Sequence, residues 1–332
     1  MLQFVLATLI IAFIVTYLAT PVIIKAAKKK GIVGNDVHKK GNPEVPELGG
    51  LAIAAGIVVA LLFVAAASSF ASLQALFNES VSVPVVLAVL CLVLIVEMIG
   101  MVDDVLGLKQ SVKLLLPIVA ALPLMAVKVS ALHSFTIPFI GSIGFITPAI
   151  YLFILIPIGV IATTNVTNTF AGYNGQETGV GSMAAFALLV IGLLKGDMLV
   201  AALSAALLGA QIAFLKFNWY PAKAFPDDVG TLLIGAMIGA IAIVGGIEAL
   251  AAVLLLPHII DFFLFKIPNR LPHAVVQTVL KDGKLHPKGK PLEFSQFIMN
   301  KFGGISEENL VKFYVGLEAL LAAVVILVAT VA

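Results

Sequence analysis

Two adjacent aspartates, Asp103 and Asp104, directly follow an apolar run of about twenty residues, and Lys113 stands at the start of the next run. Charged groups at the edge of an apolar run long enough to span a membrane usually have a function. Because adjacent residues on a helix point about 100° apart, the two aspartates are expected to have different roles. The alternative for the pair is a solvated helix cap.

Four other polar segments separate apolar runs. They are GNDVHKKGNPEVPELGG at 34–50, TTNVTNTFAGYNG at 163–175, FNWYPAKAFPDDVGT at 217–231, and the segment that contains Arg270 and His273. Carboxylates and amides without a histidine cluster or a thiol favour Mg²⁺ or Mn²⁺ over zinc or copper. Lysines and an arginine beside such an ion would neutralise phosphate oxygens during phosphoryl transfer. The pattern predicts a metal-dependent reaction on a phosphorylated substrate.

The elements that must position these groups are membrane helices. Hydrophobic residues make up 61% of the 332 residues, charged residues make up 11%, and the mean hydropathy is +1.13. This apolar content exceeds what the core of a water-soluble protein needs, so the composition predicts an all-α polytopic membrane protein. The net charge of +2 gives no reason to expect a nucleic acid partner, whereas a lipid substrate suits the membrane setting.

Ten apolar runs are long enough for transmembrane helices, and no linker divides the chain, so we expect one domain over residues 1–332. The expected helices cover about 2–24, 48–70, 82–102, 113–129, 147–164, 181–194, 198–216, 229–245, 247–267 and 313–332. The only sizeable extramembrane piece is the insertion 268–312. Within it, an Asp-Gly turn predicts a hairpin over 278–285, and spaced aromatic residues predict an interfacial helix over 291–302.

The lysines give the helices an orientation. With ten helices, the loops after the first, third, fifth, seventh and ninth helices lie on one side, and they hold 18 of the 20 basic residues. Only Lys128 and Lys195 fall on the other side. Because basic residues are enriched in cytoplasmic loops, this side is predicted to face the cytoplasm, with the N-terminus outside the cell membrane. All five polar segments fall on it, so we expect one cytoplasmic-face site built from several loops.

A secondary transporter would also contain charged residues within its helices. It would place them near the middle of the membrane and would use both faces, whereas the polar segments here share one face. This distribution favours an enzyme. A second alternative concerns Asn165 and Asn168, which share a helix face and could form a buried hydrogen-bond pair between helices instead of a site.

The motifs together resemble those of the polyprenyl-phosphate N-acetylhexosamine-1-phosphate transferases, a family of the glycosyltransferase family 4 type. The shared features are an Asp-Asp pair with a downstream lysine, an NxxN stretch with a later asparagine, and a loop of the FxGDxG[ST] type. The segment VDDVLGLKQSVKLLLP at 102–117 is similar to ADDVLNLRWRHKLLLP of the dolichyl-phosphate GlcNAc-1-phosphate transferases. The resemblance covers essentially all of the expected helices.

The resemblance implies a reaction. N-acetylhexosamine-1-phosphate, in the first instance GlcNAc-1-phosphate, would pass from a UDP-sugar to a polyprenyl or dolichyl phosphate with release of UMP, as the first step of lipid-linked glycan assembly. A phospho-MurNAc-pentapeptide-type transferase is the alternative, which the missing histidine-rich loop disfavours. A covalent phospho-aspartate is the minority alternative to direct attack by the lipid phosphate. A homodimer is compatible with the resemblance.

The resemblance also implies roles for residues at matching positions. Asn168 and Asp228 match the positions that hold Mg²⁺. Asp103, Asp104 and Lys113 match the catalytic positions, where one aspartate activates the lipid phosphate and the lysine contacts phosphate. The expected substrate-binding residues are Asp36, Lys39 and Glu47 at the nucleotide pocket, Asn174 and Phe225 at the uridine, and Arg270 and His273 at the pyrophosphate.

One departure from the family pattern concerns the metal site. Asp227 stands where the family has a glycine, directly before Asp228. A glycine lets the backbone approach a ligand closely, whereas an aspartate adds charge and bulk. The metal site could therefore be altered in this chain.

Overall fold

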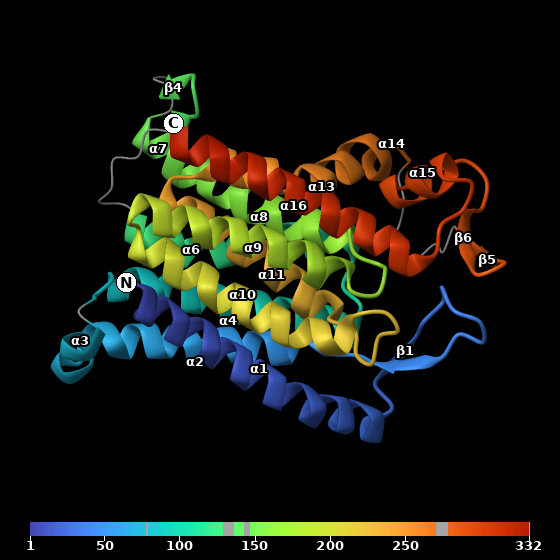
Figure 1. The fold of residues 1–332 in the computed structure, drawn as a ribbon, viewed down its shortest axis with the longest axis horizontal. Helices are drawn as coiled ribbons and strands as arrows, with labels where there is room; N and C mark the ends of the chain where they lie inside the picture. The colour runs from blue at the N-terminus through green and yellow to red at the C-terminus, as the bar shows by residue number, and fades with distance from the viewer. Residues whose placement is uncertain (78, 129–135, 143–146, 270–277, 332) are drawn as a thin grey trace.

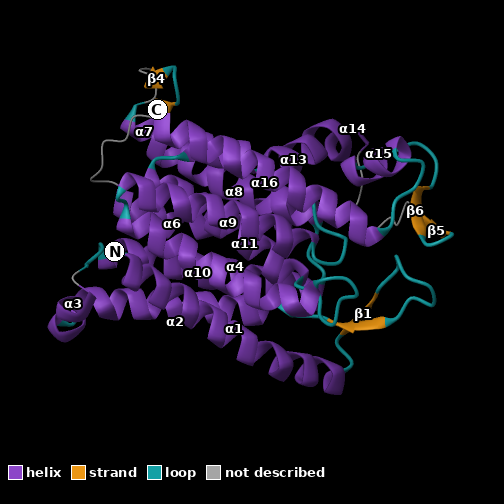
Figure 2. Cartoon of the chain, viewed as in Figure 1, coloured by secondary structure: helices purple, strands orange, loops and turns teal. Residues whose placement is uncertain are grey.

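The structure, a computed structural model, describes residues 1–77, 79–128, 136–142, 147–269 and 278–331. Over these residues, long helices run side by side in a bundle, and the strands form only short hairpins (Figures 1 and 2). Nine of the described helices are long and apolar enough to cross a membrane, and a bent pair of helices brings the number of spans to ten. The prediction of an all-α polytopic membrane protein is confirmed.

The elements alternate between long membrane helices and short connecting pieces. The helices are α1 (Leu2–Lys30), α2 (Gly50–Ser69), α3 (Ala71–Phe77), α4 (Val83–Leu106), α5 (Gln110–Leu115), α6 (Pro117–Lys128), α7 (Pro148–Ile150), α8 (Ile156–Thr169), α9 (Gln176–Lys195), α10 (Met198–Asn218), α11 (Asp227–Gly245), α12 (Glu248–Leu254), α13 (Leu256–Ile260), α14 (Ile267–Asn269), α15 (Phe294–Lys301) and α16 (Glu307–Val331). Two π-helical turns, η1 (Tyr151–Leu155) and η2 (Asp261–Lys266), precede α8 and α14. The antiparallel strand pairs are β1 (Val33–Asn35) with β2 (Glu44–Pro46), β3 (Thr136–Ile137) with β4 (Gly141–Ser142), and β5 (Thr278–Lys281) with β6 (Lys284–Pro287).

Several helices extend beyond their apolar runs into residues that the sequence predicts as loops. α1 continues to Lys30 instead of ending near residue 24, and α8 continues to Thr169 instead of 164. α9, α11 and α16 begin early, at Gln176, Asp227 and Glu307. These predicted boundaries were wrong because hydropathy marks where apolar side chains stop, whereas a helix continues as long as its backbone hydrogen bonds do.

The ninth membrane segment is broken, although the sequence predicts one helix over 247–267. α12 and the segment 256–269 meet at an angle of 70° around Leu255. Pro257 lies in the first turn of α13. Proline has no N–H to donate and disfavours the helical conformation of the residue before it, so the chain bends there. The prediction of a single continuous helix was wrong.

α11 lies in the centre of the bundle and packs against α2, α4, α8, α9 and α10. Every residue from 229 to 243 is buried. Glycines let two neighbouring helices approach closely: a Cβ on Gly100 of α4 would lie 2.6 Å from Val229 Cα, and one on Gly235 would lie 2.8 Å from the carbonyl carbon of Thr163 in α8. Small residues permit such close packing of membrane helices. These contacts hold the start of α11 beside the ends of α4 and α8.

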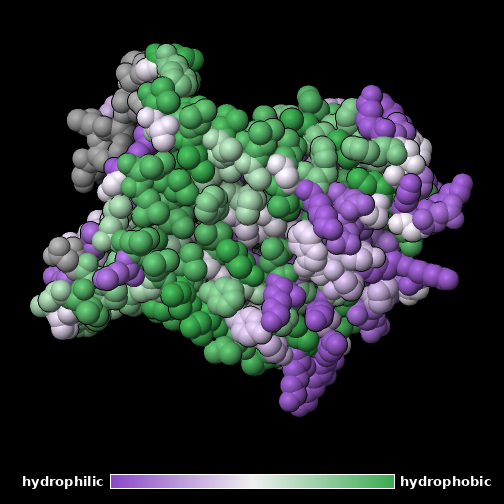
Figure 3. Space-filling view, viewed as in Figure 1, coloured by the Kyte–Doolittle hydropathy of each residue, from purple (hydrophilic) through white to green (hydrophobic). Residues whose placement is uncertain are grey.

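Four of the five predicted polar segments lie at one end of the bundle, opposite the two chain termini (Figure 1), and the fifth, with Arg270 and His273, lies outside the described residues. Figure 3 shows most of the visible hydrophilic side chains at this end and hydrophobic side chains over the rest of the face. The predicted hairpin is confirmed there, since β5 and β6 flank Asp282 and Gly283, whose φ angles are 50° and 73°. The predicted helix follows as α15. We call this region the polar end, and it comprises residues 31–49, 103–113, 168–176, 218–228 and 278–307.

Glu318 lies within the membrane-spanning part of α16. It is fully buried, and neither of its carboxyl oxygens has a partner among the described residues. Because an unpaired buried polar group costs stability, Glu318→Leu is expected to raise the midpoint of thermal unfolding. Glu318→Gln keeps a buried polar group and is the control, with little change expected. Melting curves in one detergent compare the variants, and a lower midpoint for the leucine variant would contradict the prediction.

Candidate active site

Four of the predicted site residues meet at the polar end, where α4, α5, α8 and α11 come together. Lys113 Nζ lies 2.5 Å from Asp103 Oδ2 and forms a second ion pair with Asp228 Oδ2. Asn168 Nδ2 donates to Asp228 Oδ1 at 2.5 Å and to Thr231 Oγ1 at 2.8 Å. We call Asp103, Lys113, Asn168 and Asp228 the aspartate cluster. Each of its members comes from a different helix.

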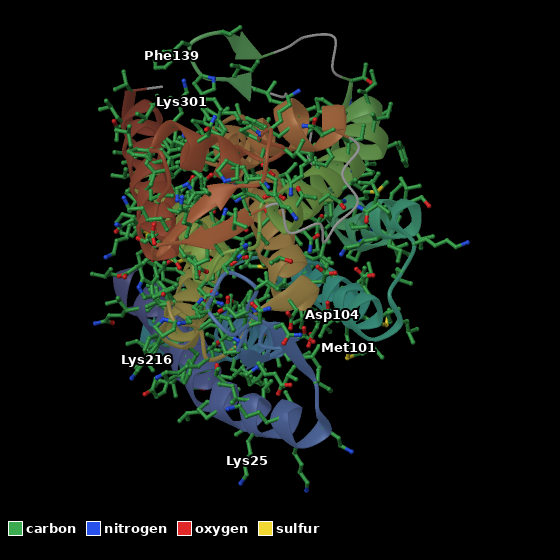
Figure 4. All side chains as sticks on the ribbon, turned by 90° about the vertical axis from the view of Figure 1, so that its right-hand side faces the viewer. Lys25, Met101, Asp104, Phe139, Lys216 and Lys301 are labelled. Carbon is green, nitrogen blue, oxygen red and sulfur yellow. The ribbon has the colours of Figure 1, made fainter. Side chains whose placement is uncertain are left out.

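The two adjacent aspartates have different partners. Asp104 Oδ1 accepts a hydrogen bond from the Asp228 N–H at 3.2 Å, and Oδ2 accepts one from the Val229 N–H at 3.3 Å. The first N–H groups of a helix lack partners within the helix, and a carboxylate there is favourable. Asp104 therefore caps α11 from the end of α4, where the two helices meet (Figure 4). Asp103 instead faces Lys113, which agrees with the expected difference between the aspartates.

Negative charge dominates around the aspartate cluster. The carboxyl groups of Asp103 and Asp228 both pair with the ammonium group of Lys113. Asp104 and Asp227 add two more, so that four carboxyl groups stand near one ammonium group in this part of the described structure. Carboxyl and amide oxygens gathered in this number are the donors that suit a hard divalent cation such as Mg²⁺.

Asn165 lies outside this cluster. Its Nδ2 donates to Leu114 O at 3.1 Å and to Ile161 O of its own helix at 2.8 Å. The first of these bonds joins α8 to α5 beside Lys113. The alternative of an interhelical hydrogen bond is therefore confirmed for Asn165, whereas Asn168 belongs to the cluster.

A second cluster forms around Lys39, which lies between β1 and β2. Lys39 Nζ lies 2.5 Å from Asp36 Oδ2 and 2.6 Å from Asn174 Oδ1. Its third partner is Glu307 Oε2, at 3.0 Å. We call Asp36, Lys39, Asn174 and Glu307 the Lys39 cluster. Glu307 was not among the residues predicted from the sequence, although the acidic pair Glu307 and Glu308 shortly before the last apolar run was a signal that could have found it.

A pocket of about 260 Å³ lies between the two clusters. Asn168 and Asp228 line it from the aspartate cluster, and Asp36 and Asn174 line it from the Lys39 cluster. Phe225 also lines it. The pocket therefore joins the predicted metal-binding residues to the predicted uridine-binding residues in one space.

His38 and Tyr173 form part of the pocket wall, and their rings stack with centroids 4.6 Å apart. Burial lowers the pKa of His38 and raises the pKa of Tyr173, so both rings are uncharged at neutral pH. Glu177 lines the pocket from the start of α9, and its Oε1 accepts from the Gly172 N–H at 2.7 Å. This bond ties the loop before Asn174 to the helix that follows it.

Four predicted substrate-binding residues are not among those that line this pocket. Lys39 instead pairs with Asp36 and Asn174, which do line it. Glu47 is not among the residues that line it, and its side chain instead lies against Gly34, where any Cβ would clash with it. Burial raises the pKa of Glu47. Arg270 and His273 lie outside the described residues, so their roles stay predictions.

Asp227, at the position of the family glycine, has a left-handed backbone with φ of 50°. This region is unusual for residues other than glycine. Its Oδ2 accepts a hydrogen bond from the Leu48 N–H, and the Gly49 N–H donates to Phe225 O at 2.9 Å beside it. Asp227 thus holds the start of α2 against the start of α11.

Asp227→Ala is expected to destabilise the protein by about 1–3 kcal/mol, because the Leu48 N–H loses its partner and alanine disfavours a left-handed backbone. Asp227→Asn keeps an acceptor and tolerates this backbone, so it is expected to retain most of the stability. Thermal unfolding in one detergent compares the two variants. Equal losses for alanine and asparagine would show that neither the hydrogen bond nor the backbone preference matters here.

Residues 85–246, from α4 to the end of α11, match a family model described as glycosyl transferase family 4. A relative from Saccharolobus solfataricus carries the provisional name UDP-N-acetylglucosamine–dolichyl-phosphate N-acetylglucosaminephosphotransferase. It is 36% identical over 329 residues, which cover 98% of this chain and 97% of the relative. A relative from Sulfolobus acidocaldarius with the same provisional name is 34% identical over 331 residues, with the same coverage. A phospho-N-acetylmuramoyl-pentapeptide-transferase from Halalkalibacterium halodurans is 30% identical over 266 residues, covering 75% of this chain and 77% of its own.

Proposed function

Because the chain belongs to glycosyl transferase family 4, we propose that it transfers GlcNAc-1-phosphate from UDP-GlcNAc to a polyprenyl or dolichyl phosphate. The products are polyprenyl-diphosphate-GlcNAc and UMP. The observation that carries the proposal is a pocket at the polar end that Asn168 and Asp228 line together with Asn174 and Phe225. Relatives named for this activity match 98% of the chain, which supports GlcNAc over a muramyl peptide as the transferred group.

In the proposed reaction, an oxygen of the lipid phosphate attacks the sugar-linked phosphorus of UDP-GlcNAc. A P–O bond forms there, and the bond from this phosphorus to the bridging oxygen breaks, so that UMP leaves with that oxygen. Asp103 orients the acceptor phosphate or takes its proton on Oδ2, because it is the aspartate that faces the cluster. Lys113 Nζ offsets the charge of the phosphate. Asp104 acts by holding the first turn of α11, and with it Asp228.

We propose that Asp228 and Asn168 hold Mg²⁺, with Mn²⁺ as the alternative ion. The support is the donor set, in which carboxylate and amide oxygens carry an excess of negative charge next to Lys113. When bound, the ion would offset negative charge on the diphosphate and help to orient it. Asp227 directs Oδ2 to the Leu48 N–H, so the extra aspartate does not remove Asp228 from this role.

An apolar groove is available for the isoprenoid tail of the acceptor. The groove has a volume of about 330 Å³ and lies between α8, α11, α12 and α13. Its lining is almost wholly apolar and includes Val166, Ile243 and Phe263. Thr163 also lines it, one helical turn and a half before Asn168 on α8. We propose that the tail lies in this groove with its phosphate directed towards the aspartate cluster.

We propose that the polar end faces the cytoplasm and that the N-terminus lies outside. Lysines at the end of α1 and α10, among them Lys25 and Lys216, lie at the edge of the polar end (Figure 4). Basic residues at the ends of membrane helices favour the cytoplasmic side. UDP-sugars would then reach the pocket from the cytoplasm, and the lipid phosphate would reach it from the inner leaflet.

Release of UMP by the purified protein tests the proposed function. The protein in detergent is given UDP-GlcNAc and a polyprenyl phosphate, with Mg²⁺ or with EDTA. UMP that requires both the lipid and the divalent ion is the expected result. A panel of UDP-sugars and UDP-MurNAc-pentapeptide then identifies the sugar. If folded protein releases no UMP from any of these donors, the proposed function is wrong.

A further inference from the structure

Glu307 links the last membrane helix to the nucleotide side of the pocket. It lies in the first turn of α16, and its side chain is only 3% exposed. Oε1 accepts from the Asn174 N–H at 2.8 Å, and Oε2 accepts from Lys39 Nζ at 3.0 Å. One carboxylate therefore holds both the backbone of Asn174 and the ammonium group that binds the Asn174 side chain.

The side-chain amide of Asn174 has an orientation that its partners define. Its Oδ1 accepts from Lys39 Nζ at 2.6 Å and from the Ala222 N–H at 2.7 Å. Ammonium and backbone N–H groups can only donate, so the atom that faces them must be the carbonyl oxygen. Both lone pairs of this oxygen are then used. No described residue accepts from Asn174 Nδ2, and Asn174 lines the pocket, so the NH₂ group is what remains for a ligand.

The insertion before α16 forms hydrogen bonds that hold the chain next to Glu307. The Leu285 N–H of β6 donates to Ile305 O at 2.7 Å, and the Ile305 N–H donates to Leu285 O at 3.2 Å. Ile305 precedes Glu307 by two residues. The hairpin thereby holds the chain at the point where it enters α16, which limits the positions that the Glu307 carboxylate can take.

We propose that Glu307 is a positioning residue that acts through Lys39 and Asn174, so that the Asn174 NH₂ group donates to a carbonyl of the nucleotide base. This inference rests on the proposed function, because it takes a uridine nucleotide as the ligand of the pocket. Uracil carries carbonyl acceptors at O2 and O4, whereas cytosine has an amino donor in place of O4. The proposed acceptor is O4, because cytosine keeps the O2 carbonyl and differs from uracil at position 4. An Asn174 NH₂ group that donates to O4 favours uridine nucleotides over cytidine nucleotides.

Binding of UMP to the purified full-length protein, measured by calorimetry, tests the inference without turnover. Glu307→Ala is expected to weaken UMP binding by about tenfold and to reduce the preference for UMP over CMP, because Asn174 and Lys39 each lose a partner. Glu307→Gln keeps an acceptor for the Asn174 N–H and is expected to lie between alanine and wild type. Glu308→Ala is the matched control, since Glu308 is adjacent and exposed and is ion-paired to Lys312. It is expected to bind UMP like the wild type.

Steady-state kinetics give a readout that a general loss of structure would not produce. In Glu307→Ala, the KM for UDP-GlcNAc is expected to rise while the KM for the polyprenyl phosphate stays unchanged. If Glu307→Ala melts and binds UMP like the wild type, or if Glu308→Ala weakens binding equally, the inference is wrong and the proposed function stands. If the wild type releases UMP from UDP-GlcNAc but binds no UMP, only the inference fails. If it neither binds nor releases UMP, the inference and the proposed function both fail. Should Glu307→Ala not fold, Glu307→Gln compared with Glu308→Gln decides in the same way.

Discussion

Asp228→Asn is expected to lower the rate of UMP formation by at least about a hundredfold while the protein stays folded. Asp228 contacts Lys113 and Asn168 at the same time, and it is a proposed ligand of the divalent ion. Asparagine has nearly the same shape but no charge, so it removes one anionic ligand and one partner of Lys113. The melting temperature is expected to stay the same or to rise, because the substitution removes a carboxylate that lies against Asp103.

The rate is measured as UMP release over a range of Mg²⁺ concentrations. A weaker metal site predicts that more Mg²⁺ is needed for half-maximal activity in the variant. Asp197→Asn is the control: Asp197 caps α10, where its Oδ1 accepts from the Val200 N–H at 3.0 Å, and asparagine can cap equally well. It is expected to keep the wild-type rate. A wild-type rate for Asp228→Asn would remove Asp228 from the proposed metal site.

Lys113→Met is expected to cost about 3–5 kcal/mol of stability and to abolish UMP formation. The Lys113 side chain is 9% exposed and pairs with both Asp103 and Asp228. Methionine fills a similar volume, but it leaves these two carboxyl groups together without their cation in a largely buried site. Removing one partner of a buried ion pair is costly because the remaining charge stays desolvated.

Thermal unfolding and UMP release are measured on the same preparations. Lys109→Met is the control, since Lys109 is exposed and lies about one turn earlier, and it is expected to behave like the wild type. Adding Asp103→Asn to Lys113→Met removes one of the repelling charges, so the double variant is expected to regain stability without regaining activity. If Lys113→Met melts like the wild type, the pairs seen around Lys113 do not contribute to stability.

The membrane architecture and the end of the bundle at which the polar groups lie could both be predicted from the sequence. The length and hydropathy of an apolar run are properties of neighbouring residues, and each membrane crossing reverses the direction of the chain. Counting membrane crossings assigns each loop to one of the two ends of the bundle. It places Asp103, Asn168 and Asp228 at the same end. The Asp282-Gly283 turn is equally local, because its backbone angles depend on the two residues themselves.

The contacts among these residues, in contrast, depend on how the helices pack. Asp103 and Asp104 are neighbours in sequence, yet the first faces Lys113 and the second caps α11. The two aspartates have different partners because α4 approaches α11 closely at Gly100, which brings Asp104 to the first N–H groups of α11. The positions at which α8 ends and α11 begins also depend on the tertiary structure, because Asn168 in the last turn of α8 donates to Asp228 and Thr231 in the first turns of α11.

Glu307 shows the limit most directly. It lies 268 residues from Lys39 in the sequence, and the two side chains meet only because the start of α16 and the segment after β1 lie side by side at the polar end. From a single sequence one can predict which residues each helix contains, but not how far apart the helices lie. The distances between helices follow from how their whole surfaces pack, and a contact between residues so far apart is a result of that packing.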